Sequence, residues 1–353
     1  MIGFRLFART PFLFYNHLVK DEFDLENIKT PDEPFENALR PHTLRDYIGQ
    51  ENVKAGLKVY IEAARLRNEP IEHVLIYGPP GLGKTTLAHV LAHETGANIR
   101  VTSGPAIERA GDLISILTSL EDSDIIFIDE IHRLGKVIEE VLYPAMEDFA
   151  VDLIIGKGPS AKTLRVDLPK FTLIGATTRI SLISSPMRDR FGIVHNLDFY
   201  NEDEIERIIE RSARILKVKN KGKGFVEIAK RSRRTPRVAN RLLKRVRDYA
   251  MVYNNSIVDQ EVTLKALDQI GVDAMGLDEI DRKILKILIE KFAGGPVGVE
   301  TLAAASSVER ETIEEVIEPY LMQIGFVKRT PRGRMATDHA FNYFGKSLPA
   351  KLL

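Results

Sequence analysis

The sequence has no cysteine among its 353 residues. This absence excludes a disulfide scaffold, a cysteine-ligated zinc site and a thiol nucleophile. It suits a reducing compartment, and we expect the protein in the cytoplasm. No apolar run reaches the roughly 18 residues that a membrane span needs. The first residues do not favour a cleaved signal peptide either, because Arg5, Arg9 and Pro11 interrupt the apolar stretch.

The sequence also lacks a net charge, because 50 Lys and Arg residues balance 50 Asp and Glu residues. A uniformly basic surface for nucleic acid is therefore excluded. A local basic surface is not, since overall balance says nothing about clustering. Internal repeats and low-complexity tracts are absent as well. The length, with 44% hydrophobic and 28% charged residues, is typical of a globular protein of two or three domains.

The apolar pattern first predicts a leader and acidic linker, weakly ordered, over residues 1–34. Residues 35–200 then alternate short apolar runs, rich in β-branched residues, with helical stretches. This alternation predicts an α/β unit with a buried parallel sheet. The expected strands are 73–77, 98–102, 124–129 and 171–175.

After residue 200 the strand pattern stops. Residues 201–272 predict a small helical domain, in which Asn201 and Glu204 form a capping box and Pro236 begins another helix. Residues 276–345 predict three helices followed by strand, tight turn and strand. That order is typical of a winged helix-turn-helix domain.

Residues 78–85, Gly-Pro-Pro-Gly-Leu-Gly-Lys-Thr, match the phosphate-binding pattern G-x-x-x-x-G-K-[ST] between an expected strand and helix. Gly81 and Gly83 let backbone N–H groups surround phosphate oxygens. Lys84 is expected on the β- and γ-phosphates, and Thr85 is expected to hold Mg²⁺ through its hydroxyl. The sequence therefore predicts a site for ATP and Mg²⁺.

An acidic pair, Asp129-Glu130, ends the strand expected at 124–129. An acid at the C-terminal end of a buried strand beside a phosphate loop is placed to contact Mg²⁺, which is the role expected of Asp129. Glu130 is the candidate for orienting or deprotonating the attacking water. His132 follows closely, but a single His is more often a packing residue, so we leave it out of the site.

From about Phe35 to about Tyr343 the chain resembles the AAA+ ATPases, and more closely their RuvB family of Holliday-junction branch-migration motors. The resemblance implies a P-loop parallel sheet with a helical lid and a C-terminal winged helix. It also implies an ATP-driven DNA motor that acts in recombination and repair. The segments that carry it are 39–41, 47–50, 78–85, 129–130, 156–161, 175–178, 185–192, 197–200, 235–237 and 329–334.

The resemblance also implies roles for single residues. Thr178, or with less support Thr177, resembles the first sensor, a hydroxyl that reports the γ-phosphate. Arg237 resembles the second sensor, which reaches the nucleotide from the lid. Nucleotide contacts are further implied for Leu39, Arg40, Ile48, Gly81, Gly83, Thr86, Glu147, Asp148, Phe149, Arg190 and Tyr200.

Arg188 and Arg190 follow the expected sensor. In the family one of them is the arginine finger that is given to a neighbour's ATP, and we favour Arg190. A guanidinium suits the charge that develops on a phosphoryl group at a subunit interface. Such a finger implies a ring, because each site needs a neighbour, and the resemblance implies a hexamer. The stretch 230–247 is rich in arginine. We expect these side chains to serve contacts of the lid and of the nucleotide rather than to form a DNA-tracking surface.

The winged-helix part divides its charge unequally. Its last helical pattern, 309–322, has five Glu and one Arg, so it is poorly suited to lie beside DNA phosphates. The hairpin over 326–337 has no acidic residue. The wing is therefore expected to contact double-stranded DNA, and the resemblance agrees for two of its arginines. The candidate contacts are Arg329, Arg332 and Arg334.

Residues 151–168 alternate around a Gly-Lys-Gly-Pro turn, which predicts a protruding hairpin. Exposed Leu153, Ile155 or Leu164 would form an interaction site there. The resemblance implies that this hairpin binds a RuvA-like junction-binding partner, and that a RuvC-like resolvase is a further partner.

Two other functions remain open from the sequence. A different AAA+ machine, such as a clamp loader or protein remodeller, would use residues 78–237 but leaves the basic wing unexplained. A nucleotide-switched DNA-binding protein is disfavoured, because a switch that barely hydrolyses ATP needs no catalytic water and hence no Glu130.

Overall fold

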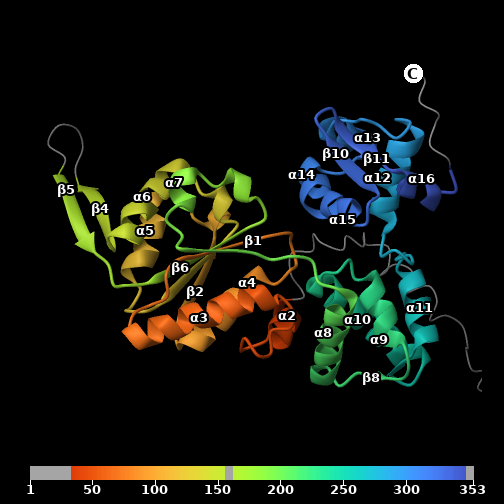
Figure 1. Ribbon diagram of the computed structural model, residues 1–353, viewed down its shortest axis with the longest axis horizontal. Helices are drawn as coiled ribbons and strands as arrows, with labels where there is room; N and C mark the ends of the chain where they lie inside the picture. The colour runs from red at the N-terminus through yellow and green to blue at the C-terminus, as the bar shows by residue number, and fades with distance from the viewer. Residues whose placement is uncertain (1–32, 156–161, 347–353) are drawn as a thin grey trace, which may run out of the picture.

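The computed structural model describes residues 33–155 and 162–346 (Figure 1). The leader and most of the linker expected over 1–34, and the turn of the hairpin at 156–161, lie outside the described residues. Figure 1 shows three bodies: a large domain built on a sheet, a helical domain beside its edge, and a small domain near the C-terminus. Within the described residues, every helix is too short or too polar to cross a membrane.

A five-stranded parallel sheet with the order β2-β3-β6-β1-β7 forms the centre of the large domain. The four strands expected from the sequence are present. The fifth, β7, is an edge strand in which only Ile193 is buried, so its apolar signal is too short to predict. The strands are β1 (Val74–Tyr77), β2 (Ile99–Ser103), β3 (Ile125–Asp129), β6 (Thr172–Thr177) and β7 (Ile193–Asn196).

Helices cover both faces of this sheet, so its central strands are apolar on both sides. In β3, Phe127 packs into the core with α3 and α4, whereas Ile126 and Ile128 pack with α5 and α6. The helices of this domain are α2 (Glu33–Leu39), α3 (Glu51–Arg67), α4 (Lys84–Thr95), α5 (Ala110–Thr118), α6 (Lys136–Glu147) and α7 (Ser185–Arg188).

The expected hairpin is formed by β4 (Ala150–Ile155) and β5 (Lys162–Asp167), which pair antiparallel. Figure 1 shows it projecting from the large domain, away from the other two bodies. Leu164 is 49% exposed on it. The side chains of Leu153 and Ile155 lie outside the described part of the structure.

The helical domain begins with the capping box that the sequence predicts. The Asn201 side chain accepts from the Glu204 N–H at 2.8 Å, and the Glu204 carboxylate accepts from the Asn201 N–H at 2.9 Å. Pro236 is the first residue of the longest helix, again as predicted. The elements are α8 (Glu202–Ile215), β8 (Lys219–Asn220), α9 (Gly224–Arg231), α10 (Pro236–Tyr253), β9 (Ile257–Val258) and α11 (Gln260–Gln269).

The C-terminal domain has the winged-helix order, but the helix expected at 309–322 is not uniform. A π-helical turn, Ile313–Ile317, interrupts it between two α-helical pieces. Such turns are rare and often occur at functional sites. The elements are α12 (Glu279–Glu290), α13 (Val299–Ser306), α14 (Arg310–Thr312), the π-turn, α15 (Glu318–Gln323), β10 (Val327–Thr330), β11 (Gly333–Ala336) and α16 (Asp338–Tyr343).

A buried ion cluster joins the helical domain to the winged helix. Arg233 is 2% exposed, and its Nη2 donates to Asp278 at 2.7 Å and to Asp281 at 2.6 Å. Its Nε donates to the Gly276 carbonyl at 3.0 Å. Burial raises the pKa of Asp281 to about 7, with Asp278 adding to the shift and Arg233 opposing it. The Arg233 guanidinium is thus the cation that pairs with both buried carboxyls.

Replacing Arg233 should strongly destabilise this junction. Arg233→Ala leaves Asp278 and Asp281 buried together without their cation, so we expect the free energy of unfolding to fall by about 3–5 kcal/mol. Chemical denaturation followed by circular dichroism measures it. The control is Arg234→Ala, an exposed neighbour, which should change stability by less than about 0.5 kcal/mol. Equal effects of the two substitutions would contradict the structural role of Arg233.

Candidate functional site

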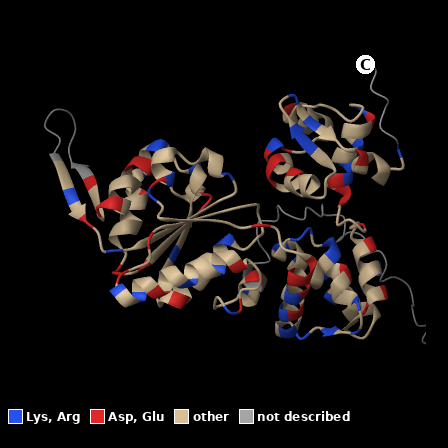
Figure 2. Cartoon of the chain, in the orientation of Figure 1, with Lys and Arg blue, Asp and Glu red and all other residues tan. Residues whose placement is uncertain are grey.

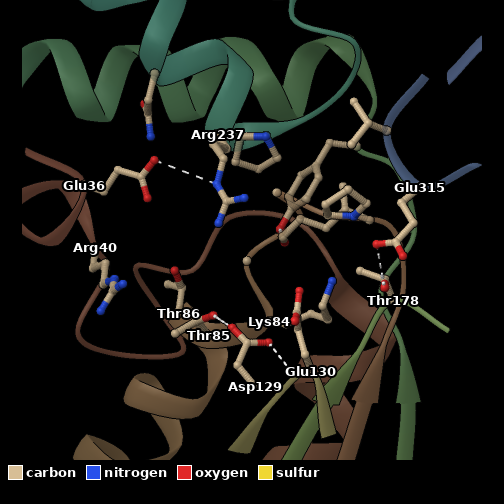
Figure 3. Close-up of a pocket in the computed structure, with 18 of the residues that line it drawn as sticks. Glu36, Arg40, Lys84, Thr85, Thr86, Asp129, Glu130, Thr178, Arg237 and Glu315 are labelled. Carbon is tan, nitrogen blue, oxygen red and sulfur yellow. Dashed lines mark hydrogen bonds and ion pairs between the residues drawn. The ribbon is translucent and has the colours of Figure 1, made fainter. Parts of the chain in front are cut away.

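A cavity of about 1110 Å³ lies where the three bodies meet. Figure 3 shows charged side chains from all three converging on it. The cavity brings together most of the nucleotide-site residues expected from the sequence. Those that line it are Leu39, Arg40, Ile48, Gly81, Gly83, Lys84, Thr85, Thr86, Asp129, Glu130, Thr178, Tyr200 and Arg237.

The phosphate loop forms one wall, and its shape depends on glycine. Gly81 has a φ of +76° and Gly83 a φ of +97°, which L side chains rarely adopt. A Cβ on Gly81 would approach Thr235 Cγ2 to 2.6 Å, and one on Gly83 would approach the Tyr47 hydroxyl to 2.8 Å. The loop can therefore lie against the lid on one side and the large domain on the other only without side chains.

Lys84 begins α4 with its amine turned back into the loop. It is 8% exposed, and its Nζ donates to the carbonyls of Gly78 at 2.7 Å and Pro79 at 2.9 Å. Burial lowers the pKa of Lys84 to about 8, an effect that the charge of Asp129 opposes. Burial destabilises the charged form of the Lys84 amine, and a bound anion would stabilise it.

The metal-site candidates are paired in the structure. Thr85 Oγ1 donates to Asp129 Oδ2 at 3.2 Å across the gap between α4 and β3. Glu130 follows with a φ of +48°, an uncommon conformation for a residue other than glycine. Its carboxylate accepts from Arg133 at 3.3 Å. Backbone strain of this kind concentrates at functional sites, and here it turns Glu130 toward the cavity.

The structure separates the two candidate sensor threonines. Thr178 lines the cavity, and its Oγ1 lies 3.4 Å from Glu315 (Figure 3). Thr177 is fully buried and hydrogen-bonds with His132 Nδ1 at 2.9 Å. Burial lowers the pKa of His132, so the ring is held neutral. His132 lines the cavity as well, although the sequence analysis left it out.

The lid forms a further wall of the cavity. The Arg237 N–H donates to the Gly81 carbonyl at 3.4 Å, and its side chain lies 3.8 Å from Glu36 of α2. On α8, Arg211 donates to the carbonyls of Leu39 at 2.6 Å and Arg40 at 3.2 Å. These contacts fix the segment before α3 against the lid. Arg211 was not predicted, because its partners are backbone atoms 172 and 171 positions away.

Tyr200 holds the phosphate loop in position through its hydroxyl. Its hydroxyl donates to the Leu82 carbonyl at 3.2 Å and to the Tyr47 hydroxyl at 3.3 Å. Burial raises the pKa of Tyr200 to about 12, so the hydroxyl stays protonated. Tyr200 therefore has a positioning contact with the loop, in addition to its place in the cavity wall.

Four residues expected near the nucleotide do not line the cavity of their own chain, so their role there stays a prediction. Glu147 and Asp148 end α6 and pair with Arg190 and Arg165, whereas Phe149 packs on Phe171. Arg190 lies on the Tyr143 ring, with its guanidinium carbon 4.4 Å from the ring centroid. Arg188, the other finger candidate, is exposed and does not line the cavity either.

The basic wing is partly neutralised by the acidic helix beside it. Arg334 donates to Glu314 and Glu318, each at 3.0 Å, and is 11% exposed in its side chain. Arg329 donates to Glu318 at 2.8 Å but is 53% exposed. Figure 2 shows these opposite charges side by side in the winged helix. Arg332, at the turn, is exposed.

The acidic helix also supplies a wall of the cavity, which the sequence analysis missed. The sequence shows the acidic charge of this helix, but which side of the helix faces the phosphate loop depends on how the domains pack. Burial raises the pKa of Glu315, while Arg179 opposes the shift. The lining residues from this domain are Glu309, Glu311, Thr312, Glu315 and Val316.

Comparisons with known proteins give the same family for all three domains. Family models match in order: the P-loop domain of the Holliday junction DNA helicase RuvB over residues 39–197, the RuvB AAA lid domain over 200–273 and the RuvB C-terminal winged helix domain over 274–345.

Solved structures are similar as well. The Thermotoga maritima RuvB Holliday junction branch migration motor is 50% identical, with a TM-score of 0.82, and the match covers 88% of this chain and 100% of that one. Two single-residue variants of Thermotoga maritima RuvB match at the same identity and 88% coverage of this chain, over 99% of theirs, with TM-scores of 0.82 and 0.81. The chain belongs to the RuvB family of Holliday junction DNA helicases.

Proposed function

We propose that this chain is an ATP-driven motor that moves duplex DNA through four-way junctions, in recombination and repair. The observation that carries the proposal is the cavity at the meeting point of three domains, with Lys84 buried in a phosphate loop beside the Thr85–Asp129 pair. A site built from all three bodies can couple what it binds to their relative positions. The absence of cysteine suits a reducing compartment, and we place this activity in the cytoplasm.

The residues present fit ATP and Mg²⁺. Lys84 and the backbone of Gly81 and Gly83 would hold the phosphates, and Thr85 with Asp129 would hold Mg²⁺. The metal supplies charge neutralisation for phosphoryl transfer. Glu130 would orient the attacking water or take its proton. Thr178 and Arg237, on opposite walls, would respond to the phosphate that leaves.

The α6 end, outside its own cavity, supports action on a neighbour. Arg190 is held by the Tyr143 ring, by the Pro186 carbonyl at 2.6 Å and by Glu147 at 3.1 Å. We assign Arg190 the role of the finger given in trans, and Arg188 is the alternative. Glu147, Asp148 and Phe149 would then contribute to a neighbour's site through this surface. Such sharing requires a ring, and a hexamer is what the family implies.

The remaining surfaces suit DNA and a protein partner. Arg329 and Arg332 on the wing would contact phosphates without reading sequence, with Arg334 holding the wing to the acidic helix. The β4–β5 hairpin, with exposed Leu164, would bind a RuvA-like junction-binding protein. A RuvC-like resolvase is a further proposed partner. Residues 35–200, 201–272 and 276–345 would act as ATPase, lid and DNA-binding units.

Removing the buried amine should abolish the ATPase reaction. Lys84→Ala takes away the cation that faces the phosphates, so we expect DNA-stimulated ATP hydrolysis to fall at least about 100-fold. The rate of ATP hydrolysis is measured as the release of inorganic phosphate. The control is Lys58→Ala, an exposed lysine on α3, which should hydrolyse ATP at the unmodified rate. Normal turnover in Lys84→Ala would remove the phosphate loop from the mechanism.

Wing substitutions should change how DNA binding depends on salt. Arg332→Ala removes one exposed phosphate-binding charge and should reduce the slope of log affinity against log salt concentration by about 1. Fluorescence anisotropy with duplex DNA at several salt concentrations measures the slope. Lys283→Ala, which removes an exposed charge on α12, should leave it unchanged. An unaltered slope in Arg332→Ala would exclude the turn as a DNA contact.

A further inference from the structure

The acidic π-turn of the winged helix touches the sensor side of the nucleotide cavity. The turn spans Ile313–Ile317 and carries Glu314 and Glu315. Both carboxylates reach from the C-terminal domain to the segment that follows β6 in the large domain, which holds Thr178 and Arg179. No assigned role of the winged helix, which is DNA binding, requires this contact.

Ion pairs make up most of the contact. Arg179 Nη2 lies 2.6 Å from Glu315 Oε1 and 3.8 Å from Glu314 Oε2. Thr178 Oγ1 donates to the other oxygen of Glu315 at 3.4 Å. Arg179 is 27% exposed and Glu315 24% exposed in their side chains. The two side chains are therefore partly exposed, although the pairing atom Arg179 Nη2 is buried, and such a pair is weaker than a fully buried one.

The contact lies in the nucleotide cavity, on the residue expected to report the terminal phosphate. Thr178 is the hydroxyl assigned to report that phosphate, and the Glu315 carboxylate accepts from it in the structure. The charge of Glu315 also acts on Lys84, and the charge of Glu130 acts on Glu315. A γ-phosphate would add further negative charge beside the same carboxylate, and like charges at close range repel.

We propose that docking of Glu315 on Thr178 and Arg179 and binding of a γ-phosphate exclude one another, so that ATP releases the winged helix from the large domain. This inference rests on the nucleotide site proposed above. Linkage makes the effect reciprocal: docking weakens ATP binding by the same factor by which ATP weakens docking. ADP lacks the competing group, so docking returns after hydrolysis. Glu315 then imitates the γ-phosphate within the chain's own site.

Glu314 keeps the turn in shape when the contact breaks. It also accepts from Arg310 at 3.1 Å and from Arg334 at 3.0 Å, both within the winged helix. Release of Arg179 therefore leaves Glu314 paired, whereas Glu315 loses its cation. The device thus depends on Glu315, and substitution of that residue tests it without dismantling the domain.

The first test compares nucleotide affinities. Glu315→Ala should tighten binding of the slowly hydrolysed analogue ATPγS about tenfold while ADP affinity changes less than about twofold, because only ATPγS meets the carboxylate. Glu315→Gln should behave alike, since it removes the charge but keeps the shape. Glu279→Ala, the same charge change on α12, is the control. An unchanged ATPγS-to-ADP affinity ratio in both Glu315 variants would overturn the proposal.

The second test follows the domains directly, which the absence of native cysteine allows. Ser181→Cys in the large domain and Met322→Cys on α15 are exposed positions for a pair of spin labels. Pulsed electron resonance should give one short distance without nucleotide or with ADP, and a longer one with ATPγS. With Glu315→Ala added, the distance should be long or broad throughout. A distance that does not depend on nucleotide would contradict the inference.

A wrong nucleotide site and a wrong role for Glu315 would give different experimental results. If the unmodified chain binds neither ATPγS nor ADP, the nucleotide site itself is wrong. If it binds both and Lys84→Ala does not, the site stands, and the affinity ratio and the label distance then decide on Glu315 alone.

Discussion

The site must meet one physical constraint: it must hold a phosphate chain of high negative charge beside neutralising groups. The loop meets it with backbone N–H groups and a buried Lys84, whose amine rests on the Gly78 and Pro79 carbonyls. That loop can exist only where Gly81 and Gly83 lack side chains, since Thr235 and Tyr47 lie against them. The requirement for phosphate binding thus also brings the lid into contact with the large domain.

The three bodies are joined by links of unequal strength. Arg233 is 2% exposed between two buried carboxyls, so separating the lid from the winged helix would strand charges in the interior. Arg179 and Glu315 keep 27% and 24% of their side chains exposed, so separating the winged helix from the large domain strands less buried charge, although Arg179 Nη2 itself is buried. The lid and winged helix should therefore move together, and the contact at the sensor should be the one that gives way. A motion of the lid at the nucleotide would then move the wing directly, because the Arg233 ion cluster joins the lid to the winged helix.

Much of this could be predicted from the sequence, because the signals are local. Buried strands appear as apolar runs, the Asn201–Glu204 box marks a helix start, and the phosphate loop is defined by adjacent residues. The parts that were missed depend on tertiary contacts. The edge strand β7 buries little, and His132 gains its place only through Thr177 across two strands. Glu147 ends α6 and does not line the cavity of its own chain, and Glu315 reaches that cavity from 137 positions beyond Thr178. Charge pattern alone could not show which surface each carboxylate meets.

The most direct measurement is dissociation of a synthetic four-way DNA junction by the chain with a RuvA-like partner, ATP and Mg²⁺. It compares the unmodified protein with Glu130→Gln, which keeps the phosphate loop and the metal site but loses the group that activates water. We predict rapid dissociation by the unmodified protein and a rate at least about 100-fold lower for Glu130→Gln despite normal ATP binding. Equal rates, or full dissociation with an ATP analogue that is not hydrolysed, would contradict the claim that hydrolysis in this cavity drives the DNA.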